Sequence, residues 1–175
     1  MISVVLFIVS TIALIAVDQL TKVWAVTQLH EAERVIPVID GVFELHYTEN
    51  RGVAFGMLQG QLWLFVPLTL LVVTLLGVML MRSPLRRFKL FTIPAVMVIA
   101  GAVGNLIDRI LYGYVIDFLY FKLIDFPIFN FADCCVVVGA ILLFIFFLFV
   151  WKDDEMPMRT MLFGVKKREK ETDNG

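Results

Sequence analysis

Four long apolar stretches, separated by polar connections, dominate the pattern of hydrophobic and polar positions along this chain. Each stretch is close to the ~20 mostly apolar residues that a transmembrane helix needs. The pattern therefore predicts an all-α membrane protein, a four-transmembrane-helix bundle that forms a single domain over residues 1–175. The expected spans are residues 2–26, 61–81, 89–110 and 131–151.

The connections predict two outer segments and a tail. Residues 27–60 contain a run rich in Val, Ile, Phe and Tyr with turn signals at Pro37 and Gly41, which is typical of short strands. Residues 111–130 are short and very apolar, so we expect them to lie along the membrane interface or dip into it. Residues 152–175 carry mixed charge, as solvated tails do. The bundle thus carries a small extracytoplasmic β-containing segment.

Composition supports this membrane assignment. The 175 residues are 60% hydrophobic, whereas soluble domains average about 45–50%. Lys and Arg concentrate in the connection between the second and third spans and in the tail, which predicts a multi-pass protein with both termini in the cytoplasm. The chain lacks a basic stripe with interleaved aromatic residues, so we expect no nucleic-acid partner. Cys134 and Cys135 are adjacent, and we interpret them as small buried hydrophobes.

Unusual polar residues collect at the outer ends of the spans. Asp18 and Lys22 are four residues apart at the end of the first span, so they share a helix face and can pair. Asn105, Asp108 and Arg109 give the third span one polar face, with Arg109 available to neutralise Asp108. We interpret these groups as packing and support. Gly101 and Gly104, on a neighbouring part of that helix, would let another helix approach closely.

Asp117 and Asp133 differ because neither has a Lys or Arg within four residues. Helix or turn capping is a serious rival explanation for each residue alone. Together, on one side of the membrane and amid aromatic residues, they favour a shared site in which two buried carboxylates hold one proton. Such a pair can activate water and polarise a carbonyl, but it can also shuttle a proton or hold a cation.

Other chemistries match the chain poorly. His30 and His46 lack metal-ligand spacing, so we interpret them as structural or surface residues, and no G-x-S-x-G motif is present. We predict no cofactor. A small proton- or cation-coupled transporter is the main alternative, but its charges belong at the bilayer midplane between repeats. A non-enzymatic assembly factor would use the charges to hold helices together. A presenilin-type protease would need a G-x-G-D motif, which is missing before Asp117.

Five short motifs, in order along nearly the whole chain, resemble those of bacterial lipoprotein signal peptidase, also called signal peptidase II. They are D-x-x-T-K at 18–22, N-x-G-x-A-F at 50–55, G-N-x-x-D-R at 104–109, V-x-D-F at 115–118 and F-N-x-A-D at 129–133. Each motif is weak alone, but five in order on a four-span frame are a specific signal. The chain departs from the family at Ala100-Gly101, where Gly-Gly is common, and at Cys134, where Ser is common.

The resemblance implies an aspartic endopeptidase of the bacterial cytoplasmic membrane. Its substrate would be a prolipoprotein, cut just before a diacylglyceryl-modified cysteine. The family also implies no metal, contact with membrane lipid and sensitivity to globomycin-type inhibitors, and one chain suffices for the site, so we expect a monomer. By resemblance, Asp117 and Asp133 are catalytic, and the residues that orient the substrate or support the pair are Asn50, Asn105, Arg109, Asn130, Asp18, Lys22 and Asp108.

Overall fold

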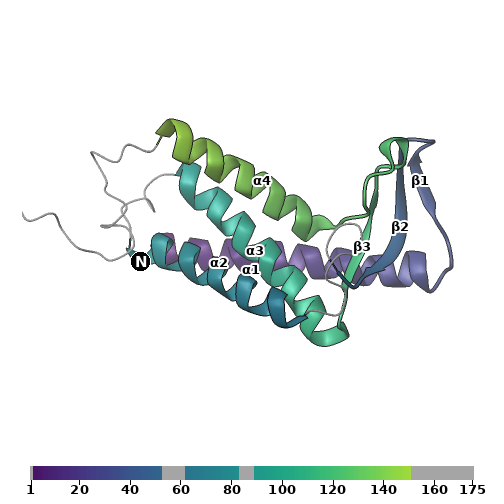
Figure 1. Cartoon of the computed structure of the whole chain (residues 1–175), viewed down its shortest axis with the longest axis horizontal. Helices are drawn as coiled ribbons and strands as arrows, with labels where there is room; N and C mark the ends of the chain where they lie inside the picture. Colours follow the sequence, from purple (N-terminus) through teal and green to yellow (C-terminus); the bar gives the residue numbers. More distant parts are fainter. Residues whose placement is uncertain (1, 53–61, 83–88, 151–175) are drawn as a thin grey trace, which may run out of the picture.

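Within the part of the chain that the structure describes, four α-helices lie beside a three-stranded sheet (Figure 1). The computed structural model describes residues 2–52, 62–82 and 89–150. Its helices are α1 (Ile2–Ala25), α2 (Leu62–Arg82), α3 (Lys89–Tyr112) and α4 (Phe131–Ile145). Two π-helical turns, η1 (Val26–His30) and η5 (Phe146–Val150), continue α1 and α4. The sheet stands at one end of the helices, and the N-terminus lies at the other end (Figure 1).

Three helices in the described part of the chain are long and apolar enough to cross a membrane. They are Val4–His30, Lys89–Tyr112 and Phe131–Val150, and they confirm the prediction of apolar spanning helices at these places. The described apolar stretch of α2, Val66–Met81, is shorter. The first helix continues past its predicted end to His30, because Leu29 is buried against the sheet beside Ala25.

The third helix is the centre of the bundle, since α3 packs against α1, α2 and α4. A hydrophobic core joins α2, α3 and α4, and the Phe91 ring of α3 lies 5.5 Å from the Phe146 ring between centroids. By contrast, apolar side chains such as Leu6 and Ile12 remain more than half exposed on α1. A bilayer covers such a face with lipid, which is consistent with a spanning helix.

Two glycines of α3 allow this close packing, as their spacing predicted. A Cβ atom at Gly101 would collide with the carbonyl oxygen of Ala132 in α4. A Cβ atom at Gly104 would lie 2.5 Å from Oδ2 of Asp18 in α1. Because both positions lack a side chain, α1 and α4 bring their polar residues against the same turn of α3.

The sheet is antiparallel with the order β1–β2–β3. Strands β1 (Ile36–Ile39) and β2 (Phe43–Asn50) form a hairpin whose turn includes Gly41 at a φ of 69°. These two strands confirm the short strands predicted from the run rich in Val, Ile, Phe and Tyr and its turn residues. Since β2 ends at Asn50, the hairpin places this residue at the end of the central strand of the sheet.

The third strand was not predicted. Residues 111–130 were expected to lie along the interface, but they supply β3 (Val115–Tyr120) and the short helix η4 (Lys122–Ile124). Burial explains the difference, because Ile116 and Phe118 pack into one apolar cluster with Ala25 and Leu29 of the first helix. Pairing with β2, in which Asp117 lies opposite Thr48, then satisfies backbone groups that this apolar setting removes from water.

Candidate active site

Asp117 is fully buried on β3 and is held by two asparagine amides. Asn50 Nδ2 donates to its Oδ2 at 2.9 Å, and Asn130 Nδ2 donates to its Oδ1 at 2.7 Å. Burial, and next the negative charge of Asp133, raise the pKa of Asp117 from 3.8 to about 7, although the two amides act in the opposite direction. Protonated and ionised forms of Asp117 are therefore both accessible near neutral pH.

Asp133 lies in the first turn of α4 and closes a capping box with Asn130. The backbone N–H of Asp133 donates to Asn130 Oδ1 at 2.9 Å, and the backbone N–H of Asn130 donates to Asp133 Oδ2 at 3.0 Å. The other carboxylate oxygen, Oδ1, accepts from Asn105 Nδ2 at 2.7 Å. Asp133 thus takes part in capping as the N3 partner of Asn130, and its contact with Asn105 leaves a shared site with Asp117 compatible with that capping. Both of its oxygens accept hydrogen bonds, as do both oxygens of Asp117.

Two asparagines connect the aspartates. Asn130 Nδ2 lies 2.7 Å from Asp117 Oδ1 and 3.0 Å from Asn105 Oδ1, and Asn105 in turn donates to Asp133. The order Asp117–Asn130–Asn105–Asp133 runs through β3, the start of α4, α3 and α4 again. The structure therefore brings together the carboxylates and amides that the motifs singled out at distant places in the sequence.

A buried ion cluster lies behind these asparagines. Lys22 Nζ lies 2.9 Å from Asp18 Oδ2, 2.8 Å from Asp108 Oδ2 and 3.0 Å from Asn105 Oδ1. The pair of Asp18 and Lys22 confirms the prediction from i, i+4 spacing. Asp108 has an ion-pair partner that the sequence did not predict, because Lys22 reaches it from α1. Asp108 faces α1, whereas Arg109 lines the pocket described next.

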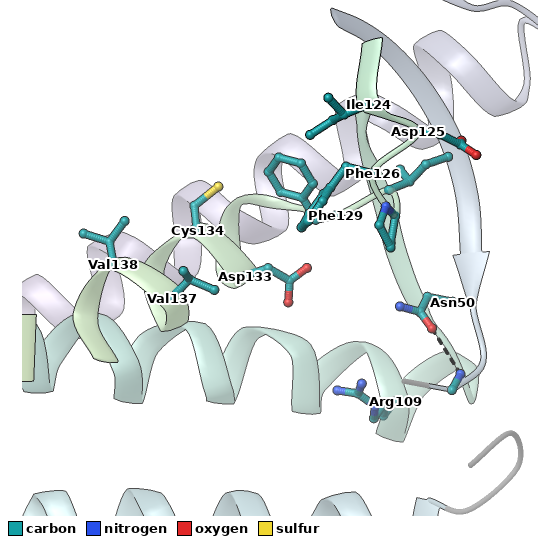
Figure 2. A pocket seen from close by; sticks show the side chains of 13 residues that line it. Asn50, Arg109, Ile124, Asp125, Phe126, Phe129, Asp133, Cys134, Val137 and Val138 are labelled. Carbon is teal, nitrogen blue, oxygen red and sulfur yellow. Dashed lines mark hydrogen bonds between the residues drawn. The ribbon is translucent and has the colours of Figure 1, made fainter. Parts of the chain in front are cut away.

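A pocket of about 960 Å³ opens beside Asp133 (Figure 2). Asp133 points into it from α4, Arg109 lies on α3, and Asn50 lies at the end of β2 (Figure 2). Most of the wall is apolar, and the lining residues are Asn50, Gly52, Arg109, Ile124, Asp125, Phe126, Pro127, Ile128, Phe129, Asp133, Cys134, Val137 and Val138. Cys134 is half-buried and lines the pocket, so the interpretation as a buried hydrophobe is wrong for Cys134 and correct for Cys135.

Gln19 is the polar residue that sequence reasoning missed. Its Nε2 lies 3.1 Å from Asp18 Oδ2, 3.1 Å from Asp108 Oδ1 and 3.3 Å from the Gly104 carbonyl oxygen. The only signal in the sequence is its place directly after Asp18, at a position that the D-x-x-T-K motif leaves open. Residues 53–55 of the second motif lie outside the described residues.

No group of three or more His, Cys, Asp or Glu side chains within residues 2–52, 62–82 and 89–150 is arranged to hold a metal ion. The acidic residues of the site instead engage amides and Lys22, as described above.

A family model described as "Signal peptidase (SPase) II" matches residues 10–149. The chain belongs to the signal peptidase II family. A protein named lipoprotein signal peptidase from Clostridioides difficile (strain 630) is 42% identical over 145 residues, which cover 82% of this chain and 95% of that protein. One of the same name from Streptococcus pyogenes serotype M1 is 41% identical over 151 residues, which cover 86% and 95%.

Solved structures agree with this membership. Two structures titled as a bacterial membrane enzyme studied by the in meso method, at 2.3 Å and 1.9 Å resolution, are each 30% identical to the chain. Their TM-scores are 0.72 and 0.71, and the matches cover 81% and 82% of this chain and 87% and 92% of theirs. This member of the signal peptidase II family is a multi-pass bacterial membrane protease of the aspartic class. The relatives do not support the transporter alternative.

Proposed function

We propose that this chain removes signal peptides from prolipoproteins by cleaving the peptide bond before a diacylglyceryl-modified cysteine, with Asp117 and Asp133 as its catalytic pair. The observation that carries this proposal is the bridged pair of aspartates beside a large, mostly apolar pocket. An apolar wall suits lipid chains and an apolar signal peptide, while the carboxylates suit hydrolysis of an amide. The names of the relatives favour the same substrate class.

The geometry supports a division of labour within the pair. Asp133 lines the pocket, where a water molecule can reach its carboxylate, so it acts as the base that takes a proton from water. Asp117, whose pKa is raised to about 7, supplies a proton that polarises the scissile carbonyl oxygen. The water oxygen bonds to the carbonyl carbon, and the carbon–nitrogen bond then breaks. A proton from the pair goes to the departing amino group of the cysteine, so the reaction needs no metal or cofactor.

The remaining polar residues divide into three roles in this proposal. Asn50, Asn105 and Asn130 orient the two carboxylates through the hydrogen bonds described above. Arg109 lines the pocket, where its charge orients a substrate carbonyl. A third set acts as support behind the pair, comprising Asp18, Lys22 and Asp108.

We propose a single-domain monomer, residues 1–175, with four spans, of which α2 is the second. The sheet would lie outside the cytoplasmic membrane and both termini inside. Its position at the end of the bundle opposite the N-terminus supports this orientation (Figure 1). At that depth a lipid-anchored cysteine could reach Asp133 from the outer leaflet, where membrane lipid borders the pocket. Globomycin-type inhibitors would compete for the same pocket.

The test is a mass-spectrometric cleavage assay of the purified full chain, reconstituted in liposomes, on a synthetic diacylated lipoprotein peptide. The wild-type chain should release the signal peptide at the bond before the modified cysteine. Asp117→Asn and Asp133→Asn should each abolish cleavage, whereas Asp40→Asn, in an exposed turn, should retain it. Cleavage by either site variant at the wild-type rate would refute the catalytic pair, and an uncut substrate with the wild-type chain would refute the function.

A further inference from the structure

Gln19 supplies a hydrogen-bond donor that the other residues of the buried ion cluster do not provide. The three N–H donors of the Lys22 ammonium group point at Asp18 Oδ2, Asp108 Oδ2 and Asn105 Oδ1. Lys22 therefore has no donor left for the second oxygen of Asp108. Gln19 Nε2 lies 3.1 Å from that oxygen and 3.1 Å from Asp18 Oδ2, so one amide connects both carboxylates.

The charge of the cluster explains why a neutral donor is suitable here. Two buried carboxylates surround one buried ammonium group, each with at most 2% of its side chain exposed. A glutamate at this position would add a third negative charge, and an apolar residue would leave Asp108 Oδ1 without the Gln19 hydrogen bond. A buried acceptor that loses its donor costs more free energy than an average hydrogen bond contributes.

Each carboxylate that Gln19 contacts also holds the residue directly before a catalytic aspartate. Asp18 Oδ1 accepts from the backbone N–H of Ala132 at 3.0 Å, and Ala132 precedes Asp133. Asp108 Oδ2 accepts from the backbone N–H of Ile116 at 3.1 Å, and Ile116 precedes Asp117. The cluster is thus hydrogen-bonded to the backbone of α4 and β3 at the residues that directly precede Asp133 and Asp117.

We propose that Gln19 is a positioning residue for the reaction: by joining Asp18 to Asp108, its amide sets the distance and angle between Asp117 and Asp133. The inference rests on the proposed function of that pair. Gln19 touches neither aspartate of the pair in these contacts, so it acts through Asp18, Asp108 and the backbone that they hold. A displacement of about 1 Å between reacting groups is enough to lower a rate about 100-fold.

The primary test is Gln19→Met, which preserves an unbranched side chain of similar length and removes both donors. Its kcat, per folded molecule of the full chain in liposomes, should fall about 10-fold or more with KM for the diacylated peptide unchanged. Gln28→Met is the matched control, since Gln28 lies near the end of the same helix and its side chain pairs with Arg34 on the exposed surface. A wild-type kcat for Gln19→Met would overturn the proposal, as would a loss that is explained entirely by less folded protein.

Gln19→Glu gives a readout that a purely structural role would not produce, and it keeps the test decisive if Gln19→Met fails to fold. The charged groups around the position are Asp18 and Lys22 on α1 and Asp108 on α3, with the Cys135 thiol of α4 near Asp18. The ionised glutamate repels both carboxylates, whereas the protonated acid can again donate to one of them. The ratio of variant to wild-type kcat should therefore rise several-fold as the pH falls from about 8 to about 5.

A ratio that stays constant over this pH range would overturn the positioning role. The wild-type chain separates this outcome from failure of the proposed function. If the wild-type chain cuts the peptide and the Gln19 variants match it in kcat and pH profile, only the inference about Gln19 fails. If the wild-type chain does not cut the peptide, the proposed function itself fails.

Discussion

Asp117→Asn is expected to abolish activity and at the same time to stabilise the folded chain at alkaline pH. Asp117 is fully buried, and burial followed by the charge of Asp133 raises its pKa from 3.8 to about 7. Between these two pH values the folded chain binds a proton here that the unfolded chain has released. The free energy of unfolding therefore falls as the pH rises through this window. The free-energy cost of burying the ionised Asp117 is absent below pH 3.8 and reaches its full size above pH of about 7.

The size of this effect follows from the same pKa values. Each pH unit contributes about 1.4 kcal/mol, so the interval from 3.8 to about 7 corresponds to roughly 4 kcal/mol. Asparagine cannot ionise, so the variant lacks this slope. Between pH of about 5 and about 8, the stability of the variant relative to wild type should increase by roughly 3 kcal/mol. For a chain of this size, that corresponds to a relative increase in Tm of roughly 6–12 °C.

The assay is thermal unfolding of the detergent-solubilised full chain at several pH values, with Asp40→Asn as the control for loss of an exposed carboxylate. The amide introduced by Asp117→Asn must also adapt to the amides of Asn50 and Asn130, but that change shifts Tm by the same amount at every pH. Only the dependence of the difference on pH tests the argument. A Tm difference that is the same at pH of about 5 and about 8 would show that burial does not keep Asp117 protonated.

Two further substitutions test the packing that supports the site. Lys22→Met leaves Asp18 and Asp108 buried without their cation, so we expect the free energy of unfolding to fall by about 3–5 kcal/mol. Adding Asp108→Asn should recover part of this loss. Equal stability of wild type and Lys22→Met would contradict the reasoning. Gly101→Ala should cost about 1–3 kcal/mol because its Cβ meets the Ala132 carbonyl oxygen, whereas Gly77→Ala, with open space around it, should be neutral or slightly stabilising; equal effects in the same unfolding assay would contradict close packing of α3 on α4.

The helices and the hairpin could be predicted because their signals are local. A run of apolar residues predicts a spanning helix, and a run rich in Val, Ile, Phe and Tyr between turn residues predicts short strands, as at residues 36–50. Strand β3 has no such signal, because Val115–Phe118 are buried on both faces and read simply as apolar sequence. Its conformation depends on pairing with β2, which is far away in the sequence, and on the apolar cluster around Leu29.

The same distinction applies to the ion cluster. The pair of Asp18 and Lys22 could be predicted from spacing on one helix, since i and i+4 side chains meet. The partner of Asp108 could not, because Lys22 reaches it only where Gly104 lets α1 approach α3. Sequence neighbours suggested only Arg109. Gln19 was missed for the same reason, since its amide joins Asp18 of α1 to Asp108 of α3 only after the two helices have packed together.

The F-N-x-A-D motif, in contrast, is a family signature that also predicts a local structure. Asn130 and Asp133 have the three-residue spacing of a capping box, and the structure contains that box at the start of α4. The Oδ1 atom of Asn130 accepts the capping hydrogen bond, and its Nδ2 atom donates to Asp117. One asparagine therefore both begins the helix and holds the partner aspartate. The spacing that starts α4 therefore also determines where the carboxylate of Asp133 lies relative to Asp117. No additional element of the fold is therefore needed to hold this helix-capping carboxylate at the site proposed for catalysis.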